Sequence, residues 1–197
     1  HGGSYIAGSI NTHRVLVANI ASAANARALI VDYRLAPENP FPAALQDAKE
    51  SYEWLLENGY SSNDIILAGD SAGGGLTLAL LHSIRDSKLK MPAGAVCLSP
   101  WTDLSGSGES NLINARKDVL LNAENLKKAA KIYAGTADIK DPLVSPIFGN
   151  LEGFPPLLIQ VGSDELLLSD SVSFAEKARV AGVDVTLEIW KDMQHVW

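Results

Sequence analysis

The sequence Gly69-Asp70-Ser71-Ala72-Gly73 limits the possible folds of this chain more than any other feature. It matches the pattern G-x-S-x-G, with an apolar run before it and a helical pattern after it. A serine placed between a strand and a helix in this way lies on a sharp turn, which needs small flanking residues and exposes the hydroxyl. A phosphate-binding loop would need Gly-Lys-Ser/Thr next, and that sequence is absent. The motif therefore predicts Ser71 as a nucleophile at the end of a strand.

Short β-rich runs alternate along the whole chain with segments whose apolar residues have helical spacing. This alternation predicts an α/β fold with a mostly parallel central sheet and helices on both faces. The expected strands are Ala28–Asp32, Asp64–Ala68, Gly94–Leu98, Pro156–Val161 and Asp184–Ile189. The expected helices are Arg14–Ala24, Pro42–Asn58, Ala72–Ser87, Ala123–Ala134 and Ser171–Ala181.

The longest connection joins the expected strands Gly94–Leu98 and Pro156–Val161. It contains one helical pattern and Gly/Ser-rich turns. A connection of this length is usually functional, and α/β proteins bind ligands at the carboxyl edge of the sheet. We therefore expect residues 101–150 to form a cap or lid insertion.

The composition indicates one globular domain and excludes several classes of function. The 197 residues are 47% hydrophobic and 20% charged, which suits a single packed core. A net charge of −7 without Lys/Arg clusters argues against nucleic acid or anionic membranes as partners. The apolar runs are too short to span a bilayer. The single cysteine, Cys97, excludes an internal disulfide and is expected in the core.

A serine nucleophile of this kind needs a histidine as base and a carboxylate to orient the histidine. His13 and His82 fall within helical patterns, and we expect them at the surface or at helix caps. His1 lies in a glycine-rich loop, which we expect it to anchor. His195 follows the last expected strand, and the chain order Ser, acid, His indicates that it is the base.

The acid is expected directly after the strand Pro156–Val161. Asp164 and Glu165 are adjacent there, and spacing alone does not separate them. We expect Asp70 to brace the turn beside the nucleophile and Asp170 to start a helix. The choice between the two adjacent carboxylates stays open on this evidence.

The sequence His1-Gly2-Gly3-Ser4-Tyr5 suits a loop whose backbone N–H groups approach an oxygen that becomes negative during attack. We assign the N–H groups of Gly2, Gly3 and Ala72 as donors to this oxyanion.

Four motifs then occur in a specific order: His1–Tyr5, Asp32–Glu38, Gly69–Gly74 and Ser99–Asp103. With them, the chain resembles the hormone-sensitive-lipase-like (bacterial family IV) carboxylesterases of the α/β-hydrolase superfamily along its whole length. The resemblance implies an α/β-hydrolase fold with a helical cap. It also implies a serine carboxylesterase that acts on short to medium acyl esters through an acyl-enzyme, without a metal or cofactor.

The family pattern also places the acid two residues before a leucine. Glu165 and Leu167 fit this spacing, so the resemblance implies a triad of Ser71, Glu165 and His195, with Asp164 as the alternative acid. Homodimerisation through the last strand, Asp184–Ile189, is a further implication of the resemblance.

The third strand of the family's sheet, part of its cap and its final helix have no counterpart in the sequence. We therefore expect residues 1–197 to be a partial catalytic domain, truncated at both ends, of a cytoplasmic protein whose true N-terminus lies elsewhere. Two alternatives remain. One is a non-catalytic α/β-hydrolase-fold protein that binds a small molecule, and the other is a lactonase or amidase with the same triad.

Overall fold

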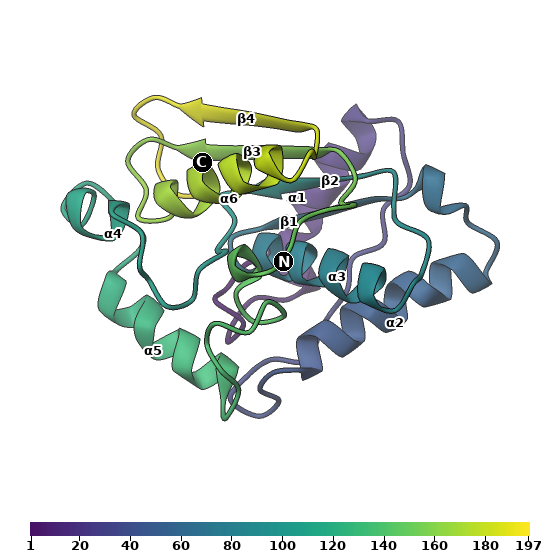
Figure 1. Ribbon diagram of the computed structural model, residues 1–197, viewed down its shortest axis with the longest axis horizontal. Coiled ribbons are helices and arrows are strands. Elements are labelled where there is room, and N and C mark those ends of the chain that lie inside the picture. The colour runs from purple at the N-terminus through teal and green to yellow at the C-terminus, as the bar shows by residue number, and fades with distance from the viewer.

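The computed structural model describes residues 1–197 and contains a four-stranded sheet (Figure 1). Its strands lie side by side in chain order, and all three neighbouring pairs are parallel. They are β1 (Ile66–Asp70), β2 (Gly94–Leu98), β3 (Leu157–Gly162) and β4 (Val185–Trp190). Since every step along the sheet goes in one direction, right-handed crossovers place the connecting helices on one face.

Six α-helices and two short 3-10 turns complete the fold. The helices are α1 (Ile10–Ala23), α2 (Ala43–Glu57), α3 (Ala72–Asp86), α4 (Ser110–Ile113), α5 (Ala123–Ala134) and α6 (Leu168–Val180). The turns are η1 (Ser62–Asp64) and η2 (Pro146–Phe148). Helix α3 packs on β1 and β2, α6 packs on β3 and β4, and α2 packs against α3. Helix α1 lies behind the sheet in Figure 1, and none of its residues is buried.

Two apolar clusters form the core. The larger one joins α2, α3 and α5, with Tyr52 and Tyr133 among its fully buried side chains. The smaller one lies between the sheet and α6 and includes Ile159 and Phe174. Cys97 is fully buried in the smaller cluster, as its apolar surroundings in the sequence predict.

The expectation of a strand at Ala28–Asp32 is wrong. This segment has no strand partner, and β1 is the edge of the sheet on the side away from β2. A groove of about 450 Å³ separates Leu29 from Trp54 of α2. A strand exists only through hydrogen bonds to a neighbouring strand, and no other part of residues 1–197 supplies one here.

The expected strand Asp64–Ala68 lies two residues further along the chain, as β1. The reason is that Ser62–Asp64 form a 3-10 turn, in which the Ser61 side chain accepts the N–H of Asn63. Strand β1 consequently ends at Asp70, so it leads directly into Ser71.

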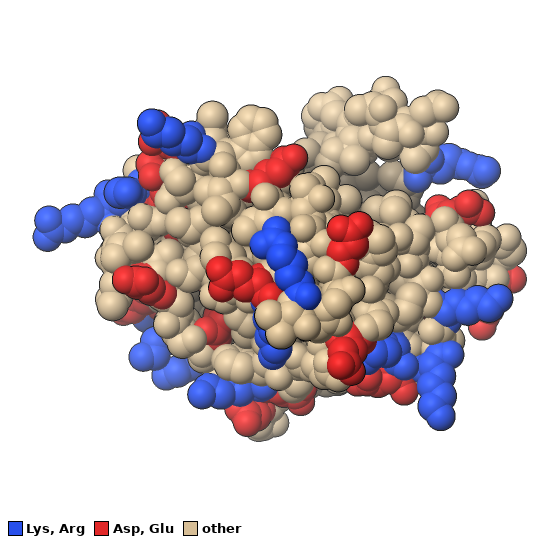
Figure 2. All heavy atoms as spheres, turned by 45° about the horizontal axis from the view of Figure 1, so that its top comes forward, with Lys and Arg blue, Asp and Glu red and all other residues tan.

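Lys and Arg side chains form no continuous basic area on the side of the molecule seen in Figure 2. Lys, Arg, Asp and Glu side chains are interspersed there. None of the six α-helices combines the length and the apolar character that a bilayer-spanning helix requires.

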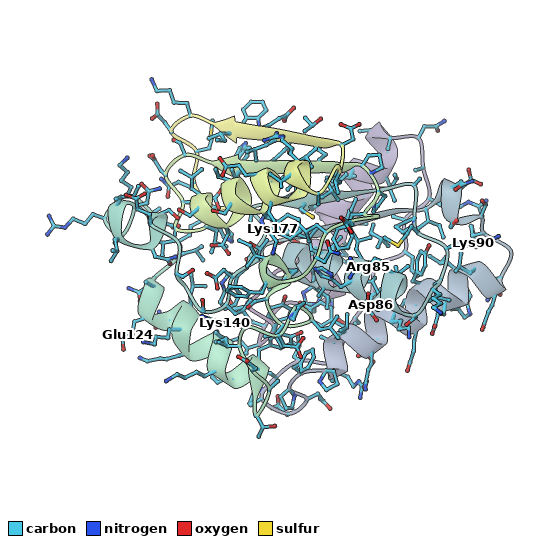
Figure 3. The ribbon with its side chains drawn as sticks, viewed as in Figure 1. Arg85, Asp86, Lys90, Glu124, Lys140 and Lys177 are labelled. Carbon is cyan, nitrogen blue, oxygen red and sulfur yellow. The ribbon has the colours of Figure 1, made fainter.

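His82 was expected at the surface or at a helix cap, and this expectation is wrong. The side chain is buried under the segment that runs from the start of η2 to β3, and its Nε2 donates to the carbonyl oxygen of Pro146 at 3.1 Å. Arg85 of α3 and Lys177 of α6, both labelled in Figure 3, donate to carbonyl oxygens of the same segment. The sequence could not indicate this burial, because the covering segment lies far from α3 along the chain.

Replacement of His82 by glutamine should make the free energy of unfolding depend less on pH below pH 6.5. Burial lowers the pKa of His82 from 6.5 to about 4, so below pH 6.5 the unfolded chain binds a proton that the folded chain does not. This residue should therefore reduce the free energy of unfolding by up to about 3 kcal/mol as the pH falls from 6.5 through 4. Urea unfolding at several pH values between 7 and 4 would measure it. Parallel pH dependences for wild type and His82→Gln would contradict the assignment.

Candidate active site

Ser71 lies on the turn between β1 and α3. Its backbone has φ 52° and ψ −120°, a conformation that costs a non-glycine residue about 1–3 kcal/mol. The Ser71 N–H donates to the carbonyl oxygen of Leu98 at 2.8 Å, and the Ser71 carbonyl oxygen accepts the N–H of Trp101 at 2.9 Å. The end of β2 and the loop after it therefore hold the turn in place.

The glycines on either side of Ser71 are needed for close packing. A Cβ atom on Gly69 would lie 2.2 Å from the carbonyl oxygen of Gly73. A Cβ atom on Gly73 would lie 2.7 Å from the carbonyl carbon of His1. The loop His1–Tyr5 therefore packs directly against the start of α3.

Ser71, His195 and Glu165 form one continuous chain of hydrogen bonds. The Ser71 hydroxyl donates to Nε2 of His195 at 2.9 Å, and Nδ1 of His195 donates to Oε2 of Glu165 at 2.7 Å. Glu165 is fully buried, and His195 is 9% exposed. This arrangement orients the imidazole so that its free nitrogen faces the hydroxyl.

The second carboxylate oxygen of Glu165 also accepts hydrogen bonds. Its Oε1 accepts the Ser99 hydroxyl at 2.7 Å and the Gly162 N–H at 2.6 Å. Asp164 does not face His195: its carboxylate lies 3.8 Å from Nζ of Lys117 and accepts the hydroxyl of Ser163. The structure thus brings Glu165, and not Asp164, to the histidine.

Ser99 is a site residue that the sequence patterns did not single out by itself. It is fully buried at the end of β2, and its hydroxyl also accepts the N–H of Val196 at 3.3 Å. One side chain thereby connects the acid to the residue after His195. The only signal in the sequence was the position of Ser99 at the start of the Ser99–Asp103 motif.

Replacement of Ser99 by alanine should lower kcat for a reaction at Ser71 by about tenfold and change KM little. The variant removes a hydrogen bond to a buried carboxylate, which is worth about 1.5–3 kcal/mol, while the triad itself stays intact. Steady-state kinetics beside Ser87→Ala, a surface control whose hydroxyl accepts a hydrogen bond from Lys49, would measure the effect. Equal kcat values for the two variants would contradict a positioning role.

The expected oxyanion donors divide into two groups in the structure. The N–H groups of Gly3 and Ala72 have no hydrogen-bond acceptor within the chain, and neither has that of Ser4. The Gly2 N–H instead donates to Oδ1 of Asp70 at 3.0 Å. The assignment of Gly2 as an oxyanion donor is therefore corrected, because its hydrogen is already bound to a carboxylate.

Aromatic stacking holds the glycine-rich loop from the other side. The ring of Tyr5 stacks on Tyr133 of α5, with centroids 3.7 Å apart, and lies 6.2 Å from that of Trp101. Tyr5 is 1% exposed, so the loop is anchored in the larger core cluster.

Comparisons with known proteins identify the family of this chain. A family model described as the alpha/beta hydrolase fold matches residues 1–197. The chain belongs to the α/β-hydrolase fold family. This confirms the fold class that the alternating strands and helices predict.

Individual relatives of this α/β-hydrolase are named acetyl-hydrolase or esterase. An acetyl-hydrolase from Streptomyces hygroscopicus is 46% identical over 197 residues, which are 100% of this chain and 66% of that protein. An esterase from Acinetobacter venetianus is 44% identical over 195 residues, which are 98% of this chain and 64% of that protein. The crystal structure of an esterase from the bacterial hormone-sensitive lipase family superposes with a TM-score of 0.99 at 49% identity, covering 100% of this chain and 66% of that one. The expected family resemblance is confirmed, and the chain spans slightly less than two thirds of the length of these relatives.

A segment within the expected lid of this α/β-hydrolase contacts the loops that carry Glu165 and His195. The Asn114 side chain donates to the carbonyl oxygen of Glu165 at 2.9 Å, and Oδ2 of Asp118 accepts the N–H of Leu166 at 2.8 Å. Gln194, directly before His195, accepts the N–H of Val119 at 3.1 Å. The segment from residue 114 to residue 119 therefore holds the loop that carries Glu165 in place relative to the loop that carries His195.

Asp170 lies in the first turn of α6, but its carboxylate serves the loop after β2. It accepts the N–H groups of Thr102 and Asp103, each at 2.8 Å. Burial raises the pKa of Asp170 to about 7, against the lowering effect of these hydrogen bonds. The Asp170 carboxylate therefore connects α6 to the loop after β2, and this loop holds the turn at Ser71 in place.

No group of three His, Cys, Asp or Glu side chains is arranged to hold a metal ion. The chemistry that these residues themselves support is attack by the Ser71 hydroxyl, with proton transfer through His195.

Proposed function

We propose that this α/β-hydrolase is a carboxylic ester hydrolase that uses Ser71, His195 and Glu165 as its catalytic triad. One observation carries the proposal: the hydrogen-bonded chain from the Ser71 hydroxyl through His195 to Glu165, with distances of 2.9 Å and 2.7 Å. The glycine-rich loop packs on the start of α3, and the backbone N–H groups of Gly3 and Ala72 have no acceptor in the protein, which supports them as oxyanion donors.

In this mechanism His195 takes the proton of the Ser71 hydroxyl as the oxygen attacks the ester carbonyl carbon. The carbonyl oxygen becomes negative, and the N–H groups of Gly3 and Ala72 stabilise it, with Ser4 as a further candidate donor. The buried Glu165 carboxylate stabilises the imidazolium that forms. His195 then gives the proton to the leaving alcohol, and the acyl group stays on Ser71.

Hydrolysis of the acyl-enzyme repeats these steps with water. His195 removes a proton from water, the resulting hydroxide attacks the acyl carbon, and Ser71 leaves as its hydroxyl after taking the proton back from His195. The carboxylic acid is released, and all groups of the protein return to their starting protonation states.

We further propose short to medium acyl esters as the substrate class. The names of the two relatives, acetyl-hydrolase and esterase, support this choice. We propose residues 101–150 as the cap region that limits the size of the substrate, within a catalytic domain that includes residues 1–197. Strand β4 is the edge of the sheet, and we propose it as the contact of a homodimer.

The test uses the full-length protein and a fluorophosphonate probe, which forms a covalent bond with an activated serine. We expect a single label on the peptide that contains Ser71. We also expect turnover of p-nitrophenyl esters that is fastest for acetate to butyrate and falls with longer chains.

The other possibilities give different results in the same experiment. A protein without label and without turnover would be a small-molecule binding protein of this fold. Labelling of Ser71 with turnover of lactones or amides, and not of these esters, would replace the substrate class but keep the triad.

A further inference from the structure

A second histidine–carboxylate pair lies on the other side of the nucleophile turn. Asp70 directly precedes Ser71 and is 8% exposed. Its Oδ2 is 3.2 Å from Nε2 of His13, and its Oδ1 accepts the Gly2 N–H at 3.0 Å. Helix α1, which carries His13, lies behind the sheet at this point (Figure 1). The catalytic mechanism described above uses neither His13 nor Asp70.

The peptide bond between His1 and Gly2 is held at both of its polar atoms. Asp70 accepts its N–H, and the Tyr33 hydroxyl donates to its carbonyl oxygen at 2.5 Å. The His1 ring stacks between those of Tyr33 and His13, with centroid distances of 4.3 Å and 5.2 Å. Since the next peptide unit carries the Gly3 N–H, these contacts determine where that oxyanion donor points.

Both ring nitrogens of His13 have oxygen partners. The carboxylate oxygen of Asp70 can only accept, so Nε2 of His13 carries a hydrogen. The Thr12 hydroxyl lies 2.8 Å from Nδ1 of His13 and 2.8 Å from the carbonyl oxygen of Ser9. When the Thr12 hydroxyl donates to Ser9, its oxygen can accept a second hydrogen from Nδ1, and the ring is then positively charged.

The charge of such a ring has a direct consequence for the reaction. A bare Asp70 carboxylate beside Gly2 would repel the negative oxygen that forms near Gly3 and Ala72, because like charges at short range in a partly buried site raise the barrier. A positively charged His13 cancels this repulsion and leaves the hydrogen bond to Gly2 in place.

We infer that His13 and Asp70 are positioning residues of the oxyanion site: together they orient the glycine-rich loop through Gly2 and neutralise the carboxylate beside the nucleophile. This inference rests on the proposed ester hydrolysis. It also explains why the first glycine of the loop is not an oxyanion donor.

The test compares His13→Gln, Asp70→Asn and the double variant in the full-length protein. His13→Gln keeps a hydrogen-bonding side chain but leaves the carboxylate unneutralised, so we expect kcat to fall by about tenfold with KM nearly unchanged. Asp70→Asn keeps an oxygen acceptor for Gly2 and removes the negative charge, so we expect kcat within about threefold of wild type. The double variant should recover to the level of Asp70→Asn.

Recovery of kcat in the double variant separates this inference from a purely structural role. A purely structural role predicts that the second substitution lowers kcat further. Arg14→Gln is the matched control, because it removes an exposed positive charge from the same helix without touching Asp70, and its kcat should equal that of wild type. The end point of fluorophosphonate labelling counts the folded, active molecules, so kcat is expressed per active site.

Two outcomes would overturn the inference: wild-type kcat in His13→Gln, or a double variant no better than His13→Gln. If wild type itself neither reacts with the probe nor hydrolyses esters, the proposed function fails instead. The two failures are therefore distinguishable in one set of measurements.

Discussion

Replacing Ser71 with alanine should lower kcat for ester hydrolysis by about 10⁵-fold and abolish fluorophosphonate labelling. The loss is large because no attacking oxygen remains, and the residual rate comes from binding and from the Gly3 and Ala72 N–H groups acting on attack by water. The Ser71 hydroxyl makes only one hydrogen bond within the protein, to His195, so the variant should fold like wild type. Steady-state kinetics and thermal unfolding of both proteins would measure this.

His195 is the only histidine whose ring is hydrogen-bonded to a serine hydroxyl. The rings of the other three contact different groups: His1 contacts Gly2, His13 contacts Thr12 and Asp70, and His82 contacts Pro146 and Arg85. Labelling of Ser71→Ala at another serine, or a kcat above about 1% of wild type, would therefore contradict the proposed mechanism as a whole.

The parts of the fold that the sequence predicts are those determined by local contacts. The turn at Ser71 is an example, because its glycines are needed for contacts within five neighbouring residues and with one loop. Helix α5 has the same bounds as its apolar spacing predicts, Ala123–Ala134, and begins at the cap residue Asn122. Strand β2 likewise coincides with its apolar run, Gly94–Leu98.

The parts that the sequence could not predict depend on partners far away along the chain. Whether Ala28–Asp32 is a strand depends on a neighbouring strand, and no local pattern shows that one is missing. The Gly2 N–H points to Asp70 only because the glycine-rich loop packs on the start of α3. The contacts of Asn114 with Glu165 are a third example, since a single asparagine in a loop carries no signal of its partner.

The choice between Glu165 and Asp164 shows both kinds of information in one place. The sequence limits the acid to two adjacent residues, because any acid must follow β3 at the edge of the sheet. The spacing to Leu167, taken from the family resemblance, favours Glu165, and the geometry of the turn directs Glu165 to His195 and Asp164 to Lys117.

Glu165→Gln should therefore lower kcat by about 10⁴-fold, and Asp164→Asn should leave kcat within about twofold of wild type. In the glutamine variant the NH₂ group must replace one of the two carboxylate oxygens. At either position it would face an N–H donor, which needs an acceptor. At Oε2 it would face Nδ1–H of His195 and drive the imidazole to the tautomer that cannot accept the Ser71 proton. At Oε1 it would face the N–H of Gly162, which has no other acceptor.

The measurement is kcat per active site for both variants, with active sites counted by complete fluorophosphonate labelling. Glu165→Gln should also lower the free energy of unfolding by about 1–3 kcal/mol if the unpaired Gly162 N–H stays buried, which thermal unfolding would detect separately. Loss of turnover in Asp164→Asn, with Glu165→Gln nearly as active as wild type, would assign the acid to Asp164. That result would require the turn after β3 to rotate by one residue, and the Gly162 and Ser99 hydrogen bonds to Glu165 oppose such a rotation.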